Sequence, residues 1–90
     1  MNAYDEMIKI CGEYINEILS VEEFQKEIEI LVLPDVCKKT LEKAQHNAVN
    51  KLEEIQFCYD LKEQKKMAKI VAEELIYTIK KYILEENGKN

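Results

Sequence analysis

The 90-residue chain is 47% hydrophobic and 34% charged, a composition typical of a folded domain rather than a disordered segment. It contains two glycines and one proline, which are too few for the many turns of an all-β fold. Its commonest residues favour helices, and its length predicts one helical domain spanning residues 1–90.

The net charge of −5 is unevenly distributed along the chain. Residues 1–35 carry nine acids and two lysines, a net −7, whereas residues 36–90 carry nine acids and eleven lysines, a net +2. The chain has no arginine, the residue that best makes bidentate contacts with phosphates and guanine. An acidic protein without arginine is a poor candidate for binding nucleic acid.

Two patterns favour a cytoplasmic location. The N-terminal region lacks the apolar run of a signal peptide, because Asp5, Glu6 and Lys9 interrupt it. The longest apolar run, residues 30–33, is far too short to span a membrane. The cysteines have no C-x-x-C spacing, so we interpret them as small core residues rather than metal or redox groups. They are Cys11, Cys37 and Cys58.

Residues 3–19 are predicted to form the first helix, with Asn2 as its N-cap. Gly12 is costly inside a helix, so we expect a neighbouring helix to approach closely there. The apolar face, at spacings of three and four, consists of Tyr4, Met7, Ile8, Cys11, Ile15, Ile18 and Leu19. The polar face includes a candidate docking face for a basic partner, made of Asp5, Glu6, Glu13 and Glu17.

A second helix is predicted from Val21 to about Leu31. Residues 20–23 fit the S-x-x-E capping box, which starts a new helix at Ser20. The apolar stripe of this segment lies about 130° round the axis from the first one, so one straight helix would not point both at a single core. A bent continuous helix over residues 3–33 is the alternative. The stripe consists of Val21, Phe24, Ile28, Leu31 and Val32.

Pro34 is expected to end the second helix and to occupy the first position of a third. The third helix has the clearest periodicity in the chain, with spacings of three and four throughout. Its apolar stripe is Cys37, Leu41, Ala44, Ala48, Leu52, Ile55 and Tyr59. His46, the only histidine, falls on the opposite, polar face, where we expect it to be exposed to solvent.

Residues 61–84 are the segment around which the rest of the chain is organised. Asp60 is a predicted N-cap, and the helix is expected to run to about residue 86, with Asn87 and Gly88 as its stop. Its main stripe consists of Ala68, Val71, Ala72, Leu75, Ile76, Ile79, Tyr82 and Ile83. About 180° away on the helical wheel lie three more apolar residues at strict seven-residue spacing, here called the heptad stripe: Ile70, Tyr77 and Leu84.

The heptad stripe has two interpretations. Either the first or second helix of the same chain covers it, or another molecule does. We favour the second interpretation, with Phe57 as a further member of the contact surface. Four lysines at the start of the same helix form a basic cluster: Lys62, Lys65, Lys66 and Lys69. This cluster would contact an acidic partner or phosphates, simply face solvent, or lie near the acidic faces of the first two helices.

Little in the sequence points to catalysis, and no catalytic, metal or cofactor site is expected. His46 lacks a nearby cysteine or a Glu-x-x-His partner, and the scarcity of glycine excludes phosphate-cradling loops. The adjacent carboxylates, such as Glu22–Glu23, point about 100° apart on solvated faces, so we expect ordinary pKa values for them.

The predicted fold is therefore all-α: an antiparallel bundle of four helices, two short and two long, with a three-helix bundle containing a bent first helix as the alternative. The predicted function is that of a small non-enzymatic protein-interaction module that forms a homodimer or joins a complex. The alternative is an acidic stoichiometric inhibitor of a basic protein, of the immunity, antitoxin or anti-repressor type. Helix-turn-helix DNA binding is the least favoured function.

Overall fold

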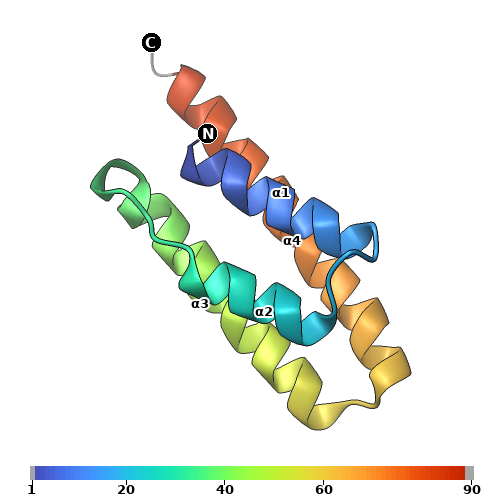
Figure 1. Ribbon diagram of the computed structural model, residues 1–90. Coiled ribbons are helices and arrows are strands. Elements are labelled where there is room, and N and C mark those ends of the chain that lie inside the picture. The colour runs from blue at the N-terminus through green and yellow to red at the C-terminus, as the bar shows by residue number, and fades with distance from the viewer. Residues whose placement is uncertain (1, 89–90) are drawn as a thin grey trace.

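The computed structural model describes residues 2–88, with side chains for residues 2–85. This part of the chain is all-α and contains four helices and no strand. They are α1 (Ala3–Ile15), α2 (Val21–Ile30), α3 (Asp35–Cys58) and α4 (Leu61–Gly88). Helix α1 packs against α4 and α2, and α3 packs against α4 and α2, as Figure 1 shows. The molecule measures 46 × 20 × 19 Å along its principal axes.

Helix α1 ends at Ile15, four residues earlier than predicted, because the chain turns left-handed at Glu17. Glu17 has a φ of 63°, and its N–H donates to the Tyr14 carbonyl. The N–H of Ile18 donates to the Glu13 carbonyl over 2.9 Å, which completes a Schellman motif. Ile18 is consequently 65% exposed, so its assignment to the core face was wrong.

The expected close approach at Gly12 is also wrong. A β-carbon built on Gly12 would meet no heavy atom within 4 Å. Gly12 therefore lies inside a helix with open space beside it, a position at which alanine is preferred.

Placing at positions 12 and 17 the residues that their backbone conformations favour should stabilise the protein. Gly12→Ala should raise the free energy of unfolding by about 0.5–1 kcal/mol, since alanine loses less backbone entropy in a helix. Glu17→Gly should add a similar amount, because glycine adopts a positive φ without the steric cost of a side chain. Thermal unfolding followed by circular dichroism should show each midpoint rising by a few degrees. A lower midpoint for Glu17→Gly would contradict the assigned C-cap.

The predicted capping box begins α2 as expected. The Ser20 hydroxyl accepts from the Glu23 N–H, and the Glu23 carboxylate accepts from the Ser20 N–H. These bonds lower the pKa of Glu23, contrary to the expectation of an ordinary value, because the backbone N–H favours the charged form. The resulting stabilisation is present above the pKa of an unfolded glutamate and is lost as the pH falls through the folded pKa. The three-helix alternative is wrong, since residues 16–20 separate two distinct helices.

The predicted boundaries of α3 and α4 hold to within two or three residues. Pro34 is the N-cap of α3 rather than its first helical residue, because the helix starts at Asp35. The Asp60 carboxylate accepts from the Glu63 N–H over 2.9 Å and so caps α4 as predicted. Helix α4 continues through Asn87 to Gly88, slightly beyond its expected stop.

The core lies where the four predicted stripes meet. Phe24, Leu41 and Leu52 are fully buried, and the main stripe of α4 is buried or half-buried. Three stripe members are exceptions: Ile18 in the turn after α1, Val32 beyond the end of α2, which is 85% exposed, and Tyr59 beyond the end of α3, which is 42% exposed. Among residues 2–88, no helix is long and apolar enough to cross a membrane.

Candidate interaction surface

The heptad stripe lies on the surface of α4. Ile70 is 53% exposed, and Tyr77 and Leu84 are each 72% exposed. On the other side of the same helix, Ala68, Ala72 and Ile79 are fully buried against the remaining helices. The interpretation that α1 or α2 covers the heptad stripe is therefore wrong. In the described part of the chain, three large apolar side chains thus lie in line, each more than half exposed.

The surface beside Ile70 continues onto α3. A shallow hollow of about 210 Å³ is lined by Ile70 and Met67 of α4 and by Ile55 and Tyr59 at the end of α3. Phe57 is 92% exposed but does not line this hollow. The apolar surface near Ile70 is thus widened by Met67 and Tyr59, which the sequence did not single out for this purpose.

One ion pair is recorded among the side chains of residues 2–85, and it bridges α3 and α4. The Lys51 ammonium lies 3.3 Å from the Glu74 carboxylate, and both side chains are more than half exposed. Exposed pairs of this kind contribute about 0–1 kcal/mol, so this one orients side chains more than it stabilises the fold.

The four acids of the predicted docking face differ in exposure. Asp5 and Glu17 are exposed, whereas Glu6 and Glu13 are half-buried. Asp5 and Glu6 occupy the first turn of α1, where the helix dipole favours negative charge. Glu13 lies in the last turn of α1, and Glu17 lies in the turn that follows it. These acids are therefore spread along the length of the helix rather than gathered at one point.

The basic cluster lies at the start of α4, and all four of its lysines are exposed. Lys65 and Lys69 border a hollow of about 730 Å³. Glu17 of the α1–α2 turn and Glu22 and Glu23 in the first turn of α2 line the same hollow. None of these side chains forms an ion pair within 4.0 Å in the described part of the chain. The lysines thus face acids of their own chain across solvent.

Two polar residues that the sequence pattern did not identify connect the helices by hydrogen bonds. The Tyr14 hydroxyl donates to the Lys65 carbonyl over 3.0 Å, which ties α1 to α4, and its ring stacks on Phe24 with centroids 4.7 Å apart. The buried Gln45 amide donates over 2.8 Å to the carbonyls of both Ile28 and Leu31, which terminates α2 against α3. The Tyr14 bond holds α1 against α4, and the Gln45 bonds hold the end of α2 against α3.

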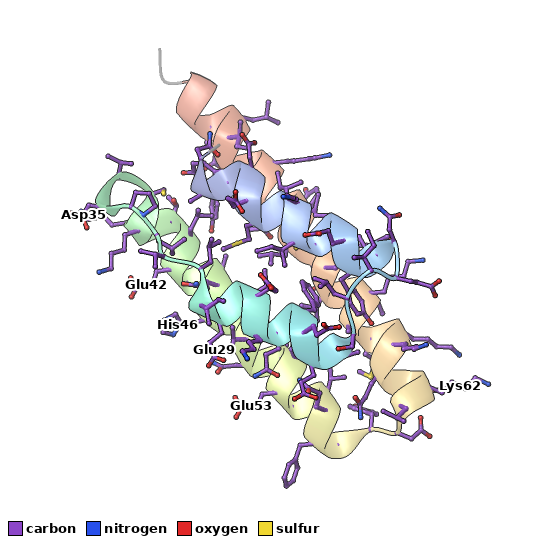
Figure 2. All side chains as sticks on the ribbon, viewed as in Figure 1. Glu29, Asp35, Glu42, His46, Glu53 and Lys62 are labelled. Atoms are coloured by element: carbon purple, nitrogen blue, oxygen red, sulfur yellow. The ribbon has the colours of Figure 1, made fainter. Side chains whose placement is uncertain are left out.

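Two cysteines are buried as expected, but Cys58 is exposed at the end of α3. Burial raises the pKa of Cys11 to about 12, so this thiol is unreactive at neutral pH. His46 is exposed, and Figure 2 shows it on the same side of α3 as Glu42. It borders a shallow hollow that also contains Asp35 and three lysines. The side chains of residues 2–85 include no group of three or more metal-ligating residues arranged to hold an ion.

The candidate surface consists of exposed apolar side chains on α4. Its apolar centre is the heptad stripe, and exposed charges surround that stripe on α4. No protein family model matches the sequence, and no curated protein or solved structure is significantly similar to the chain.

Proposed function

We propose that this chain is a small non-enzymatic protein-interaction module and that its partner is a second copy of itself. The observation that carries the proposal is the heptad stripe, in which Ile70, Tyr77 and Leu84 are 53–72% exposed in one line along α4. Isolated exposed apolar residues are common on proteins, but an aligned row of large ones is typical of an interface.

The free energy of burying the heptad stripe, compared with the cost of association, indicates how tightly two copies would bind. Burying the exposed part of the heptad stripe on both copies would contribute about 6–12 kcal/mol. Association costs an estimated 4–15 kcal/mol, so the stripe alone would not hold a tight dimer. Met67 and Tyr59 lie beside Ile70 and would widen the contact. We therefore expect a weak, reversible dimer.

The charge distribution supports α4 as the contact surface. Helices α1 and α2 belong to residues 1–35, which carry a net −7, so two copies would repel each other across that layer. Helices α3 and α4 belong to residues 36–90, with a net +2. Self-association through α4 keeps the acidic layers away from the contact.

The proposal includes the architecture and the location of the module. The connections between consecutive helices are short, which favours an antiparallel four-helix bundle, with α1 and α2 as the short pair and α3 and α4 as the long hairpin. The location we propose is the cytoplasm. The exposed Cys58 thiol suits a reducing compartment.

Tyr77→Glu tests the proposed function. It should abolish self-association, because it places a charge at the centre of the apolar contact, and it should leave the folded monomer intact because Tyr77 is 72% exposed. Val36→Glu is the matched control, since Val36 is 93% exposed on α3. Sedimentation velocity should show a smaller species for Tyr77→Glu alone. Equal sedimentation of the two variants would argue against the heptad stripe as the interface.

A stoichiometric inhibitor of a basic protein is the second candidate. It is favoured by Asp5 on α1 and Glu17 in the turn after α1, which are exposed and form no ion pair within the described residues. This function predicts binding to a basic protein that weakens with salt and is lost when Asp5 and Glu17 are both changed to lysine.

A further inference from the structure

The charges beside the heptad stripe follow a regular order along α4. Glu73 and Glu74 lie between Ile70 and Tyr77, and Lys80 and Lys81 lie between Tyr77 and Leu84. All four charged side chains are exposed. At about 100° per residue, Glu73 and Lys80 share one flank of the stripe, and Glu74 and Lys81 share the other. Each flank therefore carries an acid followed by a base seven residues later.

This order is self-complementary when two α4 helices pack antiparallel. Ile70 and Leu84 are each seven residues from Tyr77, or about 10.5 Å along the axis. A two-fold axis through Tyr77 thus places Ile70 level with Leu84 of the second copy. The same axis brings the two Tyr77 side chains together at the centre.

The flanking charges match under the same symmetry. Antiparallel packing sets each flank against the same flank of the second copy, so Glu73 faces Lys80, within about one residue rise of the same level. Glu74 faces Lys81 in the same way on the other flank. The two-fold axis repeats each pair, and this yields four contacts between opposite charges around one apolar line.

Parallel packing would bring like charges together instead of opposite ones. A two-fold axis along α4 would place the two acids level with the same acids of the second copy, and likewise the two lysines. Like charges that meet at an interface repel each other, so they disfavour the parallel orientation. The charge order therefore distinguishes the two arrangements although the apolar stripe alone would fit both.

We infer that the second copy docks with its α4 antiparallel to this α4, with the two-fold axis at Tyr77 and with Glu73 facing Lys80 across the contact. This inference rests on the proposed function, which it supplies with an orientation and a register. Glu74 already pairs with Lys51 of its own chain over 3.3 Å. Glu73 and Lys80 have no ion pair within 4.0 Å in the described residues, so they are the better pair to test.

A charge exchange at these two positions provides the test. Glu73→Lys and Lys80→Glu should each weaken self-association roughly ten- to a hundredfold, because each replaces two attractive contacts per dimer by two repulsive ones. The double variant Glu73→Lys/Lys80→Glu should recover the wild-type dissociation constant, since its exchanged charges again face each other. Glu53→Lys and Lys26→Glu, exposed on α3 and α2, are controls for net charge and should leave the constant unchanged.

Mixing distinguishes the two orientations. In the antiparallel arrangement the double variant faces like charges on the wild-type chain, so native mass spectrometry with an isotope-labelled wild type should show few mixed dimers. In parallel packing Glu73 would face Glu74 of the second copy and Lys80 would face Lys81, so mixed dimers would form in statistical proportion and the double variant would self-associate more tightly than the wild type. That result would overturn the inference while leaving the proposed function standing. A wild-type chain that stays monomeric at millimolar concentration would overturn both.

Discussion

Phe24→Ala should lower the free energy of unfolding by about 3–5 kcal/mol, the largest loss expected from one substitution in this chain. Phe24 is fully buried, and its ring stacks on Tyr14 with an interplanar angle of 13°. Alanine would leave a cavity and remove this aromatic contact, which also orients the Tyr14 hydroxyl toward α4. A 90-residue protein has a total stability of about 5–13 kcal/mol, so the variant would lose a large share of it.

The measurement is thermal or urea unfolding, and the chain contains its own control. Phe57, the only other phenylalanine, is 92% exposed, so Phe57→Ala should change the unfolding free energy by no more than about 0.5 kcal/mol. Phe24→Ala should lower the melting temperature by about 12 °C or more. Similar midpoints for both variants would mean that Phe24 does not lie in the core.

Gln45→Leu should cost about 1–3 kcal/mol, although leucine is the more apolar residue. Gln45 is buried, and its amide donates to two carbonyls at the end of α2, those of Ile28 and Leu31. Leucine would remove the donor to the Leu31 carbonyl and would leave the Ile28 carbonyl with the longer 3.4 Å bond from the Leu31 N–H. The penalty for such groups exceeds the gain from burying more apolar surface. We expect the end of α2 to fray in this variant.

Asn50→Leu is the matched control for Gln45→Leu. Asn50 is exposed on the same helix, so its substitution should lie within about 0.5 kcal/mol of the wild type. Amide hydrogen exchange should show faster exchange in α2 for Gln45→Leu and not for Asn50→Leu. A Gln45→Leu protein as stable as the wild type would show that the two carbonyls are satisfied by other donors.

The sequence predicted the helices well where local chemistry decides their ends. The capping box at Ser20 and the cap at Asp60 each satisfy a backbone N–H of the first turn, and both form as expected. The periodic spacing of α3 also identified a stripe whose members are buried from Cys37 to Ile55. Such features depend on residues close in sequence, which explains why they were predictable.

The errors arose where the chain does not follow the commonest residue preferences. Glutamate occupies the left-handed position that ends α1, a position at which glycine is usual, so nothing in the sequence marked the end at Ile15. The apolar pattern was therefore extended to Leu19, and the buried Ile10 and Tyr14 were missed. Gln45 was missed because its role depends on a contact with α2, 14–17 residues away.

The candidate surface was only half predictable. Periodicity showed that α4 is apolar on two opposite sides, but it does not tell which side the chain covers. The packing of α1 and α3 against α4 decides that, and it leaves Tyr77 and Leu84 each 72% exposed. The order of charges around Tyr77 is visible in the sequence. It indicates an orientation for a second copy only once that side of the helix is known to be exposed.

Sedimentation equilibrium of the wild-type protein over a wide concentration range tests the central claim most directly. If the heptad stripe binds a second copy, the weight-average mass should rise with concentration from 10.6 kDa toward twice that value. A mass that stays at 10.6 kDa up to millimolar concentration would contradict the proposed self-association.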